Sequence, residues 1–193
     1  MYRLESIEFG SMTFKKHKHN KMKKIILTIA LALAVNIVNA QDLFGAAREN
    51  NITQIEQLIN AGQDVNQANQ RGFTPLILAV YSNNKEAVQL LLEKGANPNA
   101  QDLSGNNALM GAAFRGYPEM AEILIANKAD VNQVNFNGAS PLIFAVTFGQ
   151  NDIAKILLDA KADTSIKDNS GKTAKDHALL QENKEMIELL STK

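Results

Sequence analysis

The chain has 193 residues, 45 % of them hydrophobic, with 20 basic and 20 acidic side chains and no cysteine. Seven of the basic and two of the acidic groups lie in residues 1–40, so 13 basic and 18 acidic groups remain in residues 41–193, a net charge of −5. Such an acidic domain does not favour a nucleic-acid partner, which requires a basic surface. Without cysteine the chain forms no disulfide, thiolate nucleophile or thiolate metal site.

The stretch MKKIILTIALALAVNIVNA, residues 22–40, has the three parts of a secretory signal peptide: two lysines, an apolar run and a small final residue. The run covers 14 residues, and a membrane span requires about 20. We predict an N-terminal extension and signal peptide over residues 1–40, with cleavage after Ala40; an uncleaved signal anchor and a buried core helix are the alternatives. Residues 41–193 are expected to be exported, to a bacterial periplasm or, alternatively, to the extracellular space.

The exported part is built from a segment that recurs every 33 residues. The copies are GFTPLILAV from Gly72, GNNALMGAA from Gly105, GASPLIFAV from Gly138 and GKTAKDHAL from Gly171. An alanine (Ala79, Ala112, Ala145, Ala178) and a leucine (Leu91, Leu124, Leu157, Leu190) keep the same register, and one step backwards meets Ala46 and Leu58. A period of this size predicts a solenoid, with units at 42–68, 69–101, 102–134, 135–167 and 168–193.

Unit 69–101 shows what each copy encodes. Gly72 suits a turn with positive φ, Thr74 can cap a helix, and Pro75 fits its first position. A second amphipathic helix follows and ends at Gly95, a residue that accepts the left-handed conformation. Two helices of about ten residues cannot bury a core alone, so each unit requires a neighbour.

This pattern resembles the ankyrin repeat, which reads roughly G-x-T-P-L-H-x-A-A and later L-L-L-x-x-G-A-D-V-N. The stretches GFTPLILAV…VQLLLEKGANPNAQD and GASPLIFAV…AKILLDAKADTSIKD follow it almost throughout. The resemblance covers residues 42–193 as three full repeats between two caps. It implies an all-α solenoid of helix pairs in an L-shaped stack with projecting β-turn fingers. It also implies that Asn66, Asn99 and Asn132 bond the backbone of neighbouring fingers.

Four departures from the family pattern carry expectations. The family histidine is replaced by Ile77, Met110 and Ile143, which removes its usual hydrogen bonds between repeats. Asn107-Ala108 replaces Thr-Pro and predicts a weaker helix start. Lys128 and Lys161 replace the terminal glycine and are expected in the left-handed conformation, at about 1 kcal/mol each. Lys175, Asp176 and His177 replace apolar residues and predict a polar terminal cap. The first unit is expected to begin directly on its helix.

No catalytic constellation is present, so we predict a protein that is not an enzyme and that has no catalytic residues, no cofactor and no metal site. His177 is the single histidine after residue 40 and is expected at the surface. Glu182, Glu185 and Glu188 have helical spacing and indicate one solvated face. The sequence also lacks the phosphate-binding loop and the zinc-protease and serine-hydrolase motifs.

In ankyrin repeats the finger tips and the ends of the first helices line a concave binding face. Transferred by register, the predicted protein-binding residues are Arg71, Phe73, Tyr81, Ser82, Leu103, Asn106, Phe114, Arg115, Phe136, Asn137, Thr147 and Phe148, with Ser104, Ala139, Asn169, Ser170 and Lys172 at the same register. Five of the eight Phe and Tyr of the exported part stand there, as at binding hot spots. The alternative is that some, Phe114 and Phe148 above all, pack sideways between repeats. Phe144 is expected in the core.

These observations predict a monomeric, non-catalytic module that binds another protein in the periplasm and that, after cleavage, contacts neither nucleic acid nor membrane. Within this class, a partner of an envelope enzyme and an immunity protein that occludes a toxin are alternatives. A secreted effector that binds a host protein is a third. Self-association through the exposed aromatics, and an enzyme dependent on His177, are the remaining alternatives.

Overall fold

The structure is a computed structural model and describes residues 42–191, which belong to one compact unit beginning at Asp42. The predicted N-terminal extension, signal peptide and cleavage site lie outside these residues. Residues 42–191 form ten α-helices and no strand, which confirms the all-α class.

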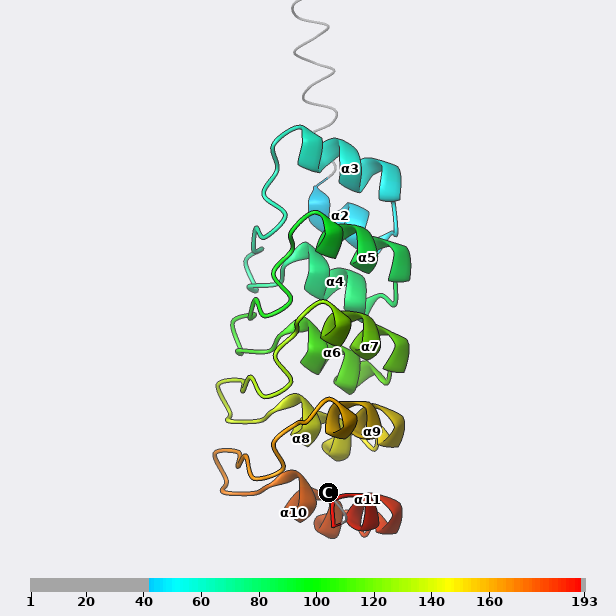
Figure 1. The fold of residues 1–193 in the computed structure, drawn as a ribbon. Coiled ribbons are helices and arrows are strands. Elements are labelled where there is room, and N and C mark those ends of the chain that lie inside the picture. The colour runs from blue at the N-terminus through cyan, green and yellow to red at the C-terminus, as the bar shows by residue number, and fades with distance from the viewer. Residues whose placement is uncertain (1–41, 192–193) are drawn as a thin grey trace, which may run out of the picture. The chain divides into compact units, whose positions relative to one another are not determined.

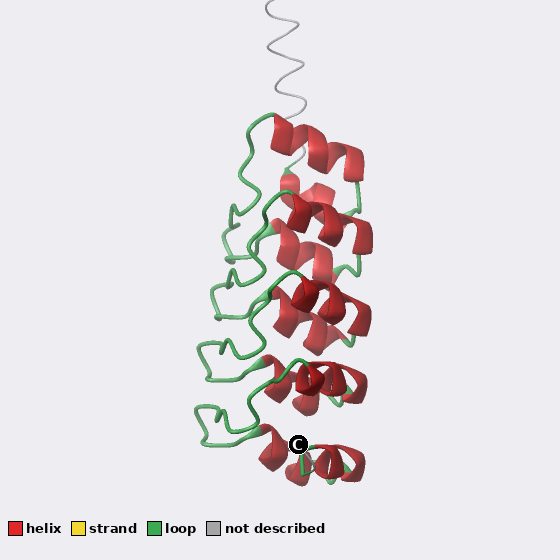
Figure 2. Ribbon diagram, viewed as in Figure 1, coloured by secondary structure: helices red, strands yellow, loops and turns green. Residues whose placement is uncertain are grey.

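The helices form five pairs, one for each predicted unit. The first helices are α2 (Leu43–Arg48), α4 (Pro75–Tyr81), α6 (Ala108–Arg115), α8 (Pro141–Thr147) and α10 (Ala174–Leu180), and the second helices are α3 (Ile52–Asn60), α5 (Lys85–Glu93), α7 (Pro118–Ala126), α9 (Asn151–Asp159) and α11 (Lys184–Leu189). The pairs stack in chain order, and the long loops between them project to one side (Figures 1 and 2). Each first helix packs against its own partner and against the neighbouring first helices. Helices this short are marginal alone, so the stack stabilises them.

The 33-residue register is the register of the core. The recurring alanines are at most 2 % exposed, and their small side chains let neighbouring first helices approach closely (Ala46, Ala79, Ala112, Ala145, Ala178). The recurring leucines of the second helices are buried as well (Leu58, Leu91, Leu124, Leu157, Leu190). Burial of one such leucine contributes about 1.5–3 kcal/mol, so the period repeats the main stabilising contacts.

Side chains cap the first helices in every unit. The Thr74 hydroxyl accepts from the Ile77 N–H at 3.2 Å, and the carboxylate of Asp42 accepts from the Gly45 N–H at 2.7 Å, so the described residues begin with a capped helix. The expected absence of a finger before this helix concerns residues outside the described range. Asn107, where a weaker helix start was expected, also caps its helix. Its amide oxygen accepts from the Met110 N–H at 2.9 Å, and its amide nitrogen donates to the Gln133 side chain. Asn107 therefore caps α6 while remaining fully buried.

The first four units also use left-handed backbone at the end of their second helices. Gly62 and Gly95 hold this position in the first two units, and Lys128 and Lys161 hold it in the next two with φ of 68° and 67°. The predicted left-handed lysines are thereby confirmed. At the turn between the two helices of the last unit, Glu182 has φ 54°, where the preceding units have Asn or Gly.

Three asparagines bond successive loops, as the resemblance implied. The side-chain oxygens of Asn66, Asn99 and Asn132 accept from the backbone N–H of Asn97, Asp130 and Asp163 at 2.7–2.8 Å. Asn66 and Asn99 also donate to backbone carbonyls one unit later. These bonds link each loop to the loop of the next unit.

The last unit is a partly polar cap. Lys175 and Asp176 are exposed, as expected, and Asp176 completes a capping box with Thr173. Leu179 is also 51 % exposed, although the equivalent Val146 is buried against the next unit. The described residues contain no unit beyond this one, so the cap leaves that contact open.

Candidate protein-binding face

One Asn or Asp side chain shapes each finger. The oxygen of Asn69 accepts from the N–H groups of Arg71 and Phe73 at 2.9 and 3.1 Å. The same two bonds, at 2.8–3.0 Å, are made by Asp102, Asn135 and Asp168. Because a side-chain oxygen satisfies two backbone donors, each finger keeps its shape without a neighbouring strand.

Backbone hydrogen bonds join the finger tips to one another. The N–H groups of Leu103, Phe136 and Asn169 donate to the carbonyls of Arg71, Ser104 and Asn137 at 3.2, 3.1 and 2.9 Å. This contact requires glycine: a Cβ on Gly105 would lie 2.6 Å from the Phe136 nitrogen. A Cβ on Gly171, in the last finger, would meet nothing within 4 Å. The tips therefore form one connected row.

Beside the fingers, five aromatic side chains form a continuous row across three units, which we call the aromatic row (Phe73, Tyr81, Phe114, Phe148, Phe144). Successive ring centroids are 6.0, 6.3, 4.7 and 5.9 Å apart, and the Phe114–Phe148 pair is T-shaped. Phe114 and Phe148 remain 42 % and 45 % exposed. The two rings therefore pack sideways against each other and still face solvent. Phe144, expected in the core, is only partly buried and extends the row.

The row depends on a glycine that sequence reasoning did not single out. Gly111 of α6 stands where the neighbouring units carry Leu78 and Phe144, and a Cβ there would lie 3.1 Å from the Tyr81 ring. In the sequence, the glycine at a register position that otherwise carries Leu78 or Phe144 was the signal that could have indicated this contact.

The environment of Tyr81 also changes its acidity. Burial raises the pKa of Tyr81, the negative Asp102 raises it further, and the positive Arg115 lowers it.

The finger tips carry a second apolar group. Leu103 and Phe136 are 71 % and 67 % exposed and occupy the same position in successive fingers. Both backbones are fixed by the tip-to-tip bonds, so these side chains are held outward on a rigid support. Large apolar groups presented in this way are typical of interaction surfaces.

The predicted arginines are exposed on the same side. Arg71 lies at a finger tip, and Arg115 ends α6, where its Nη2 donates to the Tyr117 hydroxyl at 3.1 Å and its guanidinium lies 5.6 Å from that ring. Arg48, which the prediction omitted, stands at the register position of Tyr81 and Phe114.

The polar members of the predicted face divide into two groups. Ser82, Asn137 and Thr147 are exposed, in agreement with the prediction. Asn106 instead belongs to the finger framework, because its side chain accepts from Asn135 at 2.9 Å and donates to Asp102 at 3.4 Å. Ala139, placed on the face by register alone, is buried.

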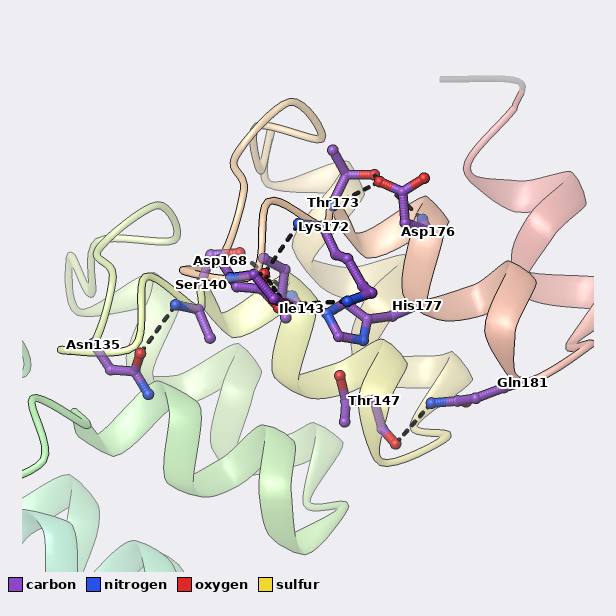
Figure 3. Close-up of polar contacts among 12 residues, drawn as sticks. Asn135, Ser140, Ile143, Thr147, Asp168, Lys172, Thr173, Asp176, His177 and Gln181 are labelled. Carbon is purple, nitrogen blue, oxygen red and sulfur yellow. Dashed lines mark hydrogen bonds and ion pairs between the residues drawn. The ribbon is translucent and has the colours of Figure 1, made fainter.

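In the last unit a histidine ties the finger to the helix (Figure 3). Nε2 of His177, on α10, lies 2.7 Å from Oδ2 of Asp168, and their side chains are 19 % and 13 % exposed. The surface placement expected for His177 is therefore wrong. Hydrogen bonds from Ser170, the Lys172 N–H and His177 hold the pKa of Asp168 well below its usual range. The pair fastens the last finger of the described residues to its own first helix.

The described residues contain no group of three His, Cys, Asp or Glu side chains placed to hold a metal ion. None of the helices within residues 42–191 is long and apolar enough to cross a membrane. The face itself presents aromatic, aliphatic and arginine side chains on a backbone held by the finger hydrogen bonds, an arrangement suited to protein recognition.

Stacked helix pairs with linked fingers define a helical repeat solenoid. A family model described as ankyrin repeats (3 copies) matches residues 43–135 and 128–193, so the chain belongs to the ankyrin repeat family. Members of this family are generally modules of protein–protein interaction. A comparison with individually characterised proteins finds no match.

Proposed function

We propose that the protein is a non-catalytic, monomeric binding module that engages one partner protein through the face formed by the finger tips and the aromatic row. The observation that carries this proposal is the aromatic row itself. Its rings contact one another across three units while Phe114 and Phe148 stay more than two-fifths exposed. A preformed aromatic surface binds with little loss of side-chain entropy, which favours recognition at this place.

We further propose that residues 41–193 act after export, in a bacterial periplasm. The support is the order of basic head, apolar run and small residues in 22–40. Mass spectrometry of the protein recovered from the periplasmic fraction is expected to show an N-terminus at Gln41. Uncleaved protein in the membrane fraction would contradict cleavage and favour a signal anchor, and protein in the medium would favour a secreted effector.

The binding proposal is tested with a C-terminally tagged protein in its own host. Wild type is expected to retain a partner from the periplasmic fraction, and the variant with Phe114→Ala and Phe148→Ala is expected to lose it. The matched control, Glu93→Ala with Glu122→Ala, removes two exposed side chains from the second helices and should retain it. Retention by all three proteins would place binding on another surface.

If the wild type retains nothing from resting cells, the partner is absent from them. That result would favour an immunity protein against an incoming toxin, or an effector, over a resident partner of an envelope enzyme. Light scattering on the purified protein checks the monomer, since a dimer lost in the Phe114, Phe148 double variant would show self-association through the same face.

A further inference from the structure

Charge is unevenly distributed between the two sets of helices. The five second helices carry nine carboxylates and three lysines. All three arginines of residues 41–193 instead lie with the aromatic row and the fingers, at Arg48, Arg71 and Arg115. The rest of residues 41–193, the first helices and the loops, holds the other nine carboxylates together with ten basic groups, so the acidic excess belongs to the second helices.

The carboxylates on this side are already occupied. Asp102 and Asp168 accept backbone N–H groups inside the fingers, and Asp176 is held in the capping box of α10. Asp42 caps α2. At the C-terminal ends of the first helices, Glu49 and Glu182 are the remaining carboxylates among the described residues, and both are exposed.

The arginines, by contrast, have no carboxylate partner. Within residues 42–191 none of the three forms an ion pair, and Arg115 makes its polar contact with the neutral Tyr117 hydroxyl. An arginine presents a planar set of donors that matches a carboxylate with two parallel hydrogen bonds. Three exposed, unpaired guanidinium groups beside a hydrophobic strip therefore favour an anionic and partly apolar ligand.

We infer that the partner segment bound on this face is an acidic polypeptide stretch, whose carboxylates pair with Arg71 and Arg115 while its apolar side chains cover the aromatic row. Arg48 extends the same set toward the first unit. This inference rests on the proposed binding function and specifies the chemistry of the partner. A nucleic acid is disfavoured, because the nine carboxylates of the second helices and the net charge of −5 oppose a phosphate chain.

A random 16-residue peptide phage library, selected on the purified protein in the form the cell produces, tests this inference. Enriched peptides are expected to be acidic and to contain leucine or aromatic residues. One enriched peptide, labelled with fluorescein, is then measured by anisotropy. Arg71→Glu with Arg115→Glu should weaken binding by roughly tenfold or more, and added salt should weaken binding to wild type. The matched control Lys94→Glu with Lys184→Glu changes charge equally, away from the face, and should change affinity by less than about twofold.

Enriched peptides that are neutral or basic but still require Phe114 and Phe148 would overturn the inference and leave the binding face standing. No enrichment, or equal loss in the lysine control, would overturn it as well, and the pull-down then decides separately on the proposed function. Tighter binding of a 20-nucleotide single-stranded DNA than of any enriched peptide would show that the face recognises a nucleic acid instead.

Discussion

The internal units and the last unit follow the same backbone path, but different interactions hold them. Internal fingers are fixed by glycines that let the next finger approach, as at Gly105, and their first helices are covered on both sides. The last finger has open space beside Gly171 and is fastened by the pair of His177 and Asp168. Polar contacts at the end of the stack thus replace packing in its middle, which makes the two regions respond differently to mutation and pH.

The largest difference is expected from equivalent leucines. Leu124→Ala, in an internal unit, should lower the free energy of unfolding by about 2–5 kcal/mol, because the cavity is enclosed by units on both sides. Leu190→Ala, at the same register in the cap, should cost no more than about 2 kcal/mol, since few neighbours enclose it. Urea unfolding followed by circular dichroism measures both. Equal losses would show that the cap packs as tightly as the middle.

Substitutions of two finger glycines distinguish the cost of backbone strain from the cost of a steric contact with the next finger. Gly105→Ala should cost about 2–4 kcal/mol, because a positive φ is strained for alanine and the new Cβ displaces the Phe136 finger. Gly171→Ala has the same φ problem and no contact, so we expect about 1–2 kcal/mol. Thermal melts of the two variants give the comparison, and a larger effect at Gly171 would contradict the tip-to-tip contact.

Acid should loosen the last unit through Asp168. Its pKa is lower in the folded chain than in the unfolded chain, so it stabilises the fold above about pH 4, and this contribution is lost as the pH falls further. Asp168→Asn keeps the acceptor oxygen that Asn69 and Asn135 use, but it cannot titrate. Unfolding free energies measured from pH 7 to pH 2.5 should fall less steeply below about pH 4 in this variant. Parallel curves for the two proteins would remove Asp168 from the acid response.

The smallest effect concerns the left-handed lysines. Lys128→Gly should raise the melting temperature by about 1–3 °C, because the relief of about 1 kcal/mol of backbone strain exceeds the entropy lost by a glycine. Lys94 lies one position before Gly95 and has a φ of −81°, so Lys94→Gly relieves no strain and should lower the melting temperature. An unchanged or lower value for Lys128→Gly would reject the strain argument.

The sequence alone was sufficient to predict the features that recur in every unit. The alanine and leucine series, the asparagines at 66, 99 and 132 and the left-handed lysines all follow from one register, because identical units make identical contacts. What differs between units was harder to predict. Phe144 is only partly buried and packs against the ring of Phe148, 5.9 Å away between centroids. His177 is partly buried because its ring contacts the carboxylate of Asp168, nine residues earlier in the chain. Both depend on a particular pair of side chains, which a register does not specify.

The hydrogen bonds between units have a consequence for how such a protein changes over generations. Each tip-to-tip bond joins residues 32 apart, and each bond from a backbone N–H to an asparagine oxygen joins residues 31 apart, with the donor always on the later unit. Removing or duplicating one 33-residue segment therefore reconnects donors to acceptors of the same kind. The length of the molecule, and with it the span of partner it can cover, is free to vary while the design of each unit stays fixed.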